Sequence, residues 1–79
     1  MATVRYFAGA RAAAGTPTEE IPAATLKELV EAVELRHGPR LGRILGACSF
    51  LVDGLVCREP ATPLSATSTV DVLPPFAGG

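Results

Sequence analysis

The stretch TLKELVEAVELRHGP, residues 25–39, contains the clearest helix signal in this sequence. Thr25 and Glu28 have the spacing of a capping box, in which a hydroxyl and a carboxylate satisfy free backbone amides at the helix start. Gly38 and Pro39 then end the helical pattern. Apolar side chains recur at helical spacing between these limits, namely Leu26, Leu29, Val30 and Val33. The sequence therefore predicts one helix with a buried stripe and a solvated face.

Two strands are predicted before this helix. Residues Thr3–Phe7 indicate a strand whose side chains alternate, which leaves Phe7 exposed on the face opposite Val4. The Ala-rich stretch Gly9–Gly15 indicates a short helix that stops at its last glycine. Thr18–Ile21 is the second strand, and the prolines on either side of it suit a sheet edge, because proline cannot donate to a strand ladder.

Three more strands are predicted after the helix. A short helical segment over 41–47 precedes the strand Ser49–Val52. Asp53-Gly54 is then a two-residue hairpin turn that tolerates positive φ, and the chain returns along Leu55–Arg58. Alternation of apolar and polar side chains over Ser68–Leu73 predicts the last strand.

This order of elements defines the expected fold. Two strands, a main helix and three strands form an α+β arrangement, with a mixed sheet of about five strands and the helix across one face. A hairpin before the helix and strands after it is the order of the β-grasp fold. We expect a single domain over residues 1–79 that ends in a flexible tail, residues 74–79.

Composition excludes several classes of partner. The chain has 79 residues, 48% of them apolar and 19% charged, with a formal net charge of −1. This balance gives no broad attraction to nucleic acid or to an anionic membrane. No apolar run approaches the roughly 18 residues of a membrane helix, so we expect a cytoplasmic protein. Cys48 and Cys57 lack metal-ligand spacing and are predicted to be buried thiols, so no metal site is expected.

Catalytic constellations are missing from the sequence. Glu19 and Glu20 are neighbours on a predicted strand and therefore point to opposite faces, so they cannot act as a carboxylate pair. His37 lies near the helix end without a nucleophile close in sequence. Packing on the core, or interaction with the helix C-terminus, explains His37 better than a role as catalytic base. We expect the chain to catalyse nothing by itself.

The end of the sequence has an unusual composition. Pro74-Pro75 cannot continue a strand ladder and stiffens the chain, after which Phe76-Ala77-Gly78-Gly79 loses side-chain bulk toward a free carboxylate. Glycines without a Cβ can thread a narrow channel in another protein. A frayed terminus is the ordinary alternative. The change from diproline to diglycine over a few residues favours a working tail.

The ending DVLPPFAGG, residues 71–79, resembles the tail of the small subunit of molybdopterin synthase. These MoaD-like proteins belong to the MoaD/ThiS group of ubiquitin-like sulfur carriers. The opening VRYFA, residues 4–8, resembles their first strand, and the helix start at Thr25 and the turn at Asp53-Gly54 match in placement. Thiamine-pathway carriers and ubiquitin-like modifiers share the diglycine, whereas the diproline favours the molybdopterin branch.

This resemblance implies a mechanism. An ATP-dependent adenylating enzyme, similar to ubiquitin-activating enzymes, would convert the Gly79 carboxylate to an acyl-adenylate, and a sulfur donor would then form a thiocarboxylate. The large subunit of molybdopterin synthase would hold the tail, residues Pro74, Pro75, Ala77, Gly78 and Gly79, while sulfur is transferred in molybdenum cofactor biosynthesis. The chain would bind no cofactor, since ATP is used by the activating partner.

The resemblance also implies a docking surface. It places Leu73 and Phe76 where the family presents apolar side chains to its partners. Strand alternation agrees for Leu73, because inward-facing valines at 70 and 72 turn it outward. The same alternation predicts an exposed Leu51, and together with Phe7 these side chains would form a partner-binding patch.

Other interpretations remain open from the sequence. A carrier of this kind could supply sulfur for thiamine, cysteine or tRNA thiolation. It could instead be a protein modifier joined to lysines through Gly79, although Lys27 is the single lysine available for chains on itself. A plain interaction module with an inert tail is the third alternative.

Overall fold

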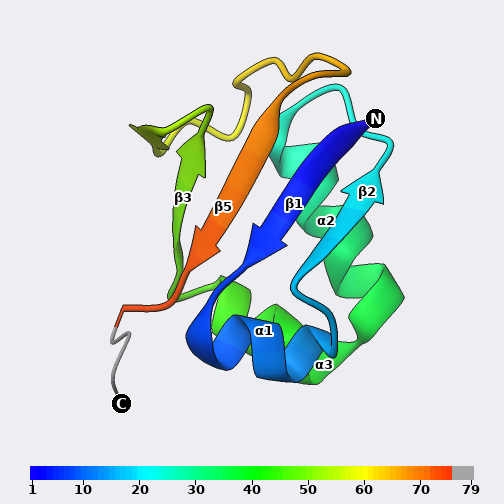
Figure 1. Cartoon of the computed structure of the whole chain (residues 1–79), viewed down its shortest axis with the longest axis vertical. Coiled ribbons are helices and arrows are strands. Elements are labelled where there is room, and N and C mark those ends of the chain that lie inside the picture. Colours follow the sequence, from blue (N-terminus) through cyan, green and yellow to red (C-terminus); the bar gives the residue numbers. More distant parts are fainter. Residues whose placement is uncertain (76–79) are drawn as a thin grey trace.

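The computed structural model describes residues 1–75 and shows five strands and three helices (Figure 1). The elements are β1 Ala2–Tyr6, α1 Ala8–Ala14, β2 Thr18–Ile21, α2 Leu26–His37, α3 Pro39–Leu45, β3 Ser49–Val52, β4 Leu55–Cys57 and β5 Thr69–Leu73. The predicted strands and helices are all present, with ends that differ from the prediction by one or two residues. No helix within residues 1–75 has the length and apolar character needed to cross a bilayer.

The five strands form one mixed sheet in the order β2-β1-β5-β3-β4. β1 and β5 are parallel neighbours at its centre, and the other pairs are antiparallel. This arrangement confirms the predicted β-grasp fold. β2 lies at an edge, as its flanking prolines predicted, and β4 forms the other edge.

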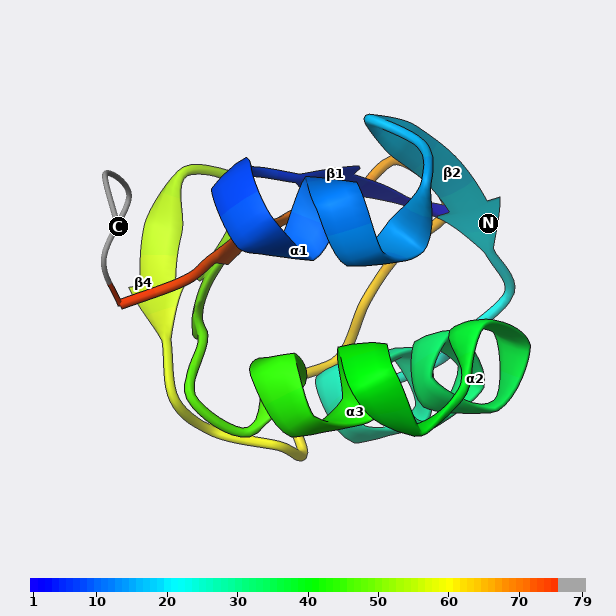
Figure 2. The same ribbon diagram turned by 90° about the horizontal axis from the view of Figure 1, so that it is seen from below.

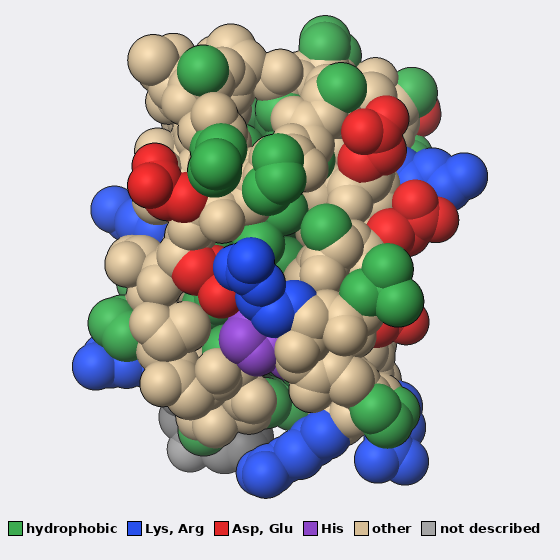
Figure 3. Space-filling view, turned by 90° about the vertical axis from the view of Figure 1, so that its right-hand side faces the viewer, with side chains coloured by type: hydrophobic (Ala, Val, Ile, Leu, Met, Phe, Trp, Pro, Cys, Tyr) green, Lys and Arg blue, Asp and Glu red, His purple; other side chains and the backbone are tan. Residues whose placement is uncertain are grey.

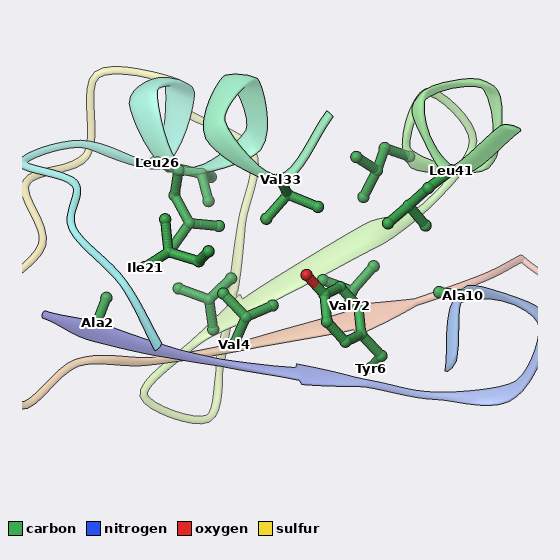
Figure 4. Packing of buried hydrophobic residues seen from close by; sticks show 12 residues of the cluster. Ala2, Val4, Tyr6, Ala10, Ile21, Leu26, Val33, Leu41 and Val72 are labelled. Carbon is green, nitrogen blue, oxygen red and sulfur yellow. The ribbon is translucent and has the colours of Figure 1, made fainter. Parts of the chain in front are cut away.

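The core lies between this sheet and two helices. Inward side chains of the central strands, such as Val4, Val70 and Val72, are fully buried. Leu26, Leu29 and Val33 face them from α2, and Leu41 and Leu45 from α3 (Figure 4). α3 begins at Pro39, two residues before the predicted segment, because proline fits the first helical turn, where its missing N–H costs nothing.

α1 and α3 lie at one end of the molecule, where Figure 2 views them from below. Ala10 of α1 is buried between the end of the sheet and α3. Gly15 ends α1 in the left-handed conformation with φ of 76°, which explains the predicted stop. The opposite face of the sheet has no helix of residues 1–75 across it.

The β3–β4 turn has the backbone that its sequence predicts. Asp53 and Gly54 have φ of 50° and 86°, the two positive values of a tight hairpin turn. Asp53 has a second role that the sequence did not indicate. Its Oδ1 accepts from the Thr69 N–H at 2.9 Å, and its own N–H donates to the Thr69 carbonyl at 2.8 Å. The turn is therefore fastened to the start of β5.

The start of α2 is capped differently from the prediction. Thr25 Oγ1 accepts from the Glu28 N–H at 3.2 Å, as a capping box requires. Glu28 Oε1, however, accepts from the Ala24 N–H rather than from Thr25, so that half of the predicted box is wrong. The Leu26 and Lys27 amides donate to backbone carbonyls of the 60–62 loop. This returning loop, together with Thr25, satisfies the first turn of the helix.

Replacing Thr25 tests how much its side chain contributes to the cap. Thr25→Ala should lower the free energy of unfolding by about 0.5–2 kcal/mol, because the Glu28 N–H loses its acceptor. Thr25→Ser keeps the hydroxyl and serves as the matched control. Denaturant unfolding of the three proteins measures the difference. Equal stability of the Ala variant and the wild type would show that the loop alone caps the helix.

A polar cluster joins the edge strand β2 to the end of α2. Glu19 Oε1 accepts from the Tyr6 hydroxyl at 2.5 Å and lies 2.6 Å from His37 Nε2, while Glu19 Oε2 lies 3.5 Å from Arg36 Nη1. The His37 ring also packs edge-on against Tyr6. Figure 3 shows the histidine at the surface of this side, beside an acidic and a basic side chain. As predicted, Glu20 points to the other face and is exposed.

The cluster shifts the acidity of two of its members. Burial of Glu19 by itself raises the pKa, but hydrogen bonds from Tyr6 and His37 and the positive charges of His37 and Arg36 outweigh it. The pKa of Glu19 therefore lies below its ordinary value of 4.5. Burial, followed by the hydrogen bond to Glu19 and the Glu19 charge, raises the pKa of Tyr6 well above its usual range.

The lowered pKa of Glu19 gives stability a definite pH dependence. A carboxyl whose pKa is lower in the folded chain stabilises the fold above the unfolded value, and this contribution is lost as pH falls through the lower folded value. Glu19→Gln should lower the free energy of unfolding at neutral pH by about 1–3 kcal/mol and should flatten the loss of stability in acid. Glu20→Gln, at the exposed neighbour, is the control. Unfolding curves that keep the wild-type slope in acid would contradict a role for Glu19.

Candidate functional site

The face of the sheet opposite the helices carries an ion pair at its centre. Arg5 of β1 and Asp71 of β5 lie directly opposite each other in the parallel register. Arg5 Nε lies 2.7 Å from Asp71 Oδ1, and Arg5 Nη2 donates to Oδ2 at 3.2 Å. Asp71 is 8% exposed, so two hydrogen bonds to one guanidinium satisfy a nearly buried carboxylate. The pair fixes the relation of the two strands on this face.

Phe7 and Leu73 meet at the end of the same two strands. The Phe7 N–H donates to the Val72 carbonyl at 3.2 Å, which continues the β1–β5 pairing past Tyr6 and brings Phe7 level with Leu73. Phe7 is 38% exposed, and the Arg5 guanidinium carbon lies 5.5 Å from the centre of its ring. This cation–π contact holds the ring at the surface. Exposure of Phe7, as predicted, is confirmed.

Leu73 and Leu51 lie on this open face, but neither is fully exposed. Leu73 is half-buried, and its neighbour Val72 is completely buried, so the predicted outward direction of Leu73 is confirmed. Leu51 also points outward, since its register partner is Asp71. The prediction that Leu51 is exposed is wrong, because Leu51 is half-buried between β5 and β4.

Val56 is the outward residue that the sequence prediction missed. It lies opposite Leu51 in the β3–β4 register and is 64% exposed. Alternation along Leu55–Cys57 could have indicated it, because its neighbour Cys57 pairs with the inward Phe50. Phe7, Leu51, Val56 and Leu73 together form the outer-face patch of apolar side chains around the Arg5–Asp71 pair.

The chain leaves the sheet at the end of this patch. Pro74 is half-buried and Pro75 is exposed, so the predicted diproline stands at the point where strand pairing stops. The remaining predicted tail residues, Phe76, Ala77, Gly78 and Gly79, lie outside the described residues. Leu73 of the predicted docking surface is therefore followed directly by Pro74 and Pro75, the described part of the predicted tail.

Residues 1–75 contain no assembled metal centre. They contain no group of three or more His, Cys, Asp or Glu side chains that could hold a metal ion. Every buried side-chain nitrogen or oxygen among them has a hydrogen-bond partner. His37 and Glu19 are partners of each other in the cluster beside β2, away from the outer-face patch.

The two cysteines are free and half-buried rather than fully buried. Cys48 Sγ donates to the Ile44 carbonyl at 3.1 Å, and burial raises the pKa of its thiol. Cys57 Sγ lies 3.0 Å from Thr62 Oγ1. A raised pKa disfavours the reactive thiolate, so Cys48 is a weak nucleophile.

Solved structures of other proteins resemble this chain over nearly its whole length. The small archaeal modifier protein 1 of Methanosarcina acetivorans superposes with a TM-score of 0.87 at 23% identity, over 99% of this chain and 95% of that one. A putative molybdopterin converting factor subunit 1 from Pyrococcus furiosus gives 0.84 at 26% identity, over 95% and 97% of the two chains.

A third similar chain comes from the complex of subunits 1 and 2 of molybdopterin-converting factor from Helicobacter pylori. It has a TM-score of 0.74 and 28% identity, over 99% of this chain and 97% of that one. None of the curated proteins matches the chain significantly in sequence.

The model of the ThiS family matches residues 4–79, which is nearly the whole sequence. The match begins in β1 and includes the tail beyond β5. This family match agrees with the β-grasp sheet and with the diproline at the end of β5. The chain belongs to the ThiS family of ubiquitin-like sulfur carriers.

Proposed function

We propose that this protein is a sulfur carrier whose working group is the carboxylate of Gly79, and that it serves molybdopterin synthesis as the small subunit of molybdopterin synthase. The observation that carries the proposal is the tail itself. A family match running to residue 79 includes the diglycine, and the described chain leaves the sheet at a diproline beside an apolar patch. A side-chain-poor tip of this kind fits a narrow channel in a partner.

The chemistry follows from the low reactivity of a carboxylate. An adenylating partner would join Gly79 to the α-phosphate of ATP, which releases pyrophosphate and leaves an acyl-adenylate. A sulfide equivalent from a sulfur donor would attack the acyl carbon, and the bond to AMP would break to leave a thiocarboxylate. The acid–base groups for both steps would belong to the partners. This chain contributes the position of one terminal atom.

Two similarities support the molybdopterin branch. The Pyrococcus furiosus and Helicobacter pylori matches, at 26% and 28% identity, are both named as molybdopterin converting factors. The second was solved as a complex of two subunits, which supports a large partner subunit for this chain. The outer-face patch would provide the apolar contact with that partner, because the exposed Phe7 and Val56 lie there with the half-buried Leu51 and Leu73.

A protein modifier would use the same first step. The likeness to small archaeal modifier protein 1 shows the shared fold, and an activated Gly79 could react with a lysine instead of sulfide. The products differ in mass, so one assay separates the alternatives. Thiolation exchanges oxygen for sulfur at the C-terminus, whereas conjugation adds a whole protein chain.

Leu73 is the described residue that should matter most for partner contact. Leu73→Ala should weaken binding to the large subunit by more than about 1 kcal/mol, because an apolar anchor at an interface is lost. It should lower the free energy of unfolding by only about 1 kcal/mol, since the side chain is half-buried in the free chain.

Two variants calibrate this measurement by calorimetry and thermal unfolding. Leu55→Ala removes the same atoms from the start of β4, where the side chain is 75% exposed, and should leave binding unchanged. Val72→Ala truncates the buried neighbour and should destabilise the fold strongly. If Leu73→Ala were as destabilising as Val72→Ala, Leu73 would be a core residue rather than an anchor.

Gly79 tests the function directly. Deleting it moves the carboxylate back by up to about 3.3–3.6 Å, and adding one residue after it moves the carboxylate forward by the same reach. Both changes should abolish adenylation and sulfur transfer while melting temperatures stay near wild type, because near-attack geometry tolerates far less displacement. Intact mass after incubation with ATP, the adenylating enzyme and a sulfur donor is the measurement.

An extra residue before Met1 is the matched control. Met1 is 63% exposed and lies at the other end of the molecule from Pro75 (Figure 1), so this variant should be thiolated normally. Thiolation of either Gly79 variant, without trimming back to Gly79, would show that the carboxylate position is irrelevant and that the proposed function is wrong.

A further inference from the structure

One end of the molecule is basic although the whole chain is slightly acidic. α1 and α3 carry Arg11, Arg40 and Arg43 and contain no acidic residue. All eight Asp and Glu residues of the chain lie outside these two helices. The three arginines are exposed, and none forms an ion pair with another of residues 1–75. We call these three arginines the basic end.

The basic end lies where the tail leaves the fold. β1 and β5 run parallel, so the start of α1, directly after β1, and the end of β5 are at the same end of the sheet. α3 leads within four residues to Ser49 of β3, which pairs with Leu73 at the end of β5. Figure 3 shows basic side chains gathered at the lower end of the molecule. A protein that takes up the tail would therefore work at the end of the sheet where α1 and α3 lie.

The uneven distribution of charge over the chain favours a compact acidic partner at the basic end over a long polyanion. With a formal net charge of −1 for the whole chain, the part outside the basic end is strongly negative. A long polyanion such as RNA would meet repulsion as soon as it extends past the two helices. A protein surface with acidic side chains confined to a rim around a channel would meet the three arginines, although one carboxylate, that of Glu34 in α2, also lies against α3 at Gly42.

We propose that the basic end is an electrostatic docking surface for an acidic rim around the tail channel of the adenylating partner. This inference rests on the proposed function, because it assigns the surface to the partner that would adenylate Gly79. Attraction between complementary patches raises the rate of encounter and orients the two proteins before apolar contacts form. The outer-face patch would then supply the contacts that keep the tail in place.

The surface beside Arg11 has the shape for such a contact. A hollow of about 320 Å³ lies between Arg5, Phe7 and Arg11, next to the end of β1. Arg5 is already paired with Asp71, so Arg11 is the side chain in this hollow that is left to bind an incoming carboxylate. A single glutamate or aspartate of the partner could occupy the hollow with its charge toward Arg11.

Paired charge reversals test the proposal. Arg40→Glu with Arg43→Glu changes the basic end, and Lys27→Glu with Arg58→Glu makes an equal change of net charge elsewhere. Stopped-flow association with the recombinant adenylating enzyme of the same genome is measured from about 0.02 M to about 0.5 M NaCl, over which electrostatic screening becomes nearly complete. Intact mass reports thiolation of each variant at saturating enzyme.

We expect the Arg40/Arg43 variant to associate about ten-fold more slowly than wild type at low salt and at nearly the same rate at high salt. The association rate of the Lys27/Arg58 variant at low salt should fall much less. Arg11→Glu alone should lower the low-salt rate too, but by less than the Arg40/Arg43 pair, and its rate should also recover at high salt. Every variant should still be thiolated at saturating enzyme, because the tail is unchanged. Arg40→Gln with Arg43→Gln repeats the test if the Glu pair lowers the melting temperature.

Three results would overturn the inference in distinguishable ways. Equal rates for the two charge-reversed pairs, with normal thiolation, would reject the docking surface and leave the sulfur-carrier function in place. Absence of thiolation in the wild type itself would reject the proposed function and the inference with it. Tight binding of a 20-nucleotide RNA (about 20 charges) that the Arg40/Arg43 change abolishes, with enzyme association unchanged, would assign the basic end to nucleic acid.

Discussion

The parallel pairing of β1 with β5 is the contact on which the rest of this structure depends. It joins the first and last strands, and its register places Val4 beside Val70 and Tyr6 beside Val72 in the core. The same register puts Arg5 opposite Asp71 on the other face. Because both strands run in one direction, the end of β5 lies beside the start of α1. The chain therefore leaves the sheet next to the outer-face patch and α1 as a consequence of strand direction.

Local sequence signals were sufficient for most of the elements. The hydroxyl at Thr25, the Asp53-Gly54 turn and the glycine at the end of α1 each specify a backbone conformation within a few residues. Alternation also predicted that Leu73 points outward. Val70 and Val72 are apolar residues two positions apart and both point into the core, so the next residue points to the other face. These predictions needed no knowledge of which strands are neighbours.

Most features that the sequence did not predict involve residues far apart in the chain. The Arg5–Asp71 pair spans 66 positions, so it becomes visible only when β1 and β5 are known to be adjacent. The half-burial of Leu51 depends on Val56 and Asp71 across two strand boundaries. The Leu26 and Lys27 amides are bound by carbonyls of the 60–62 loop, a contact that only the fold reveals. For the tail, composition and resemblance predicted a role. That prediction stays untested by the structure, because residues 76–79 lie outside the described residues.

The parallel β1–β5 pair also affects how the protein is made. A ribosome synthesises β1 first and β5 last among the elements, and β1 cannot complete its place at the centre of the sheet until β5 has emerged. Domains usually fold as units during or after synthesis, and this one has to wait for its final strand. A prematurely terminated chain would therefore lack the central pairing as well as the tail. Folding itself would ensure that partners encounter only chains complete through the strand that carries the tail.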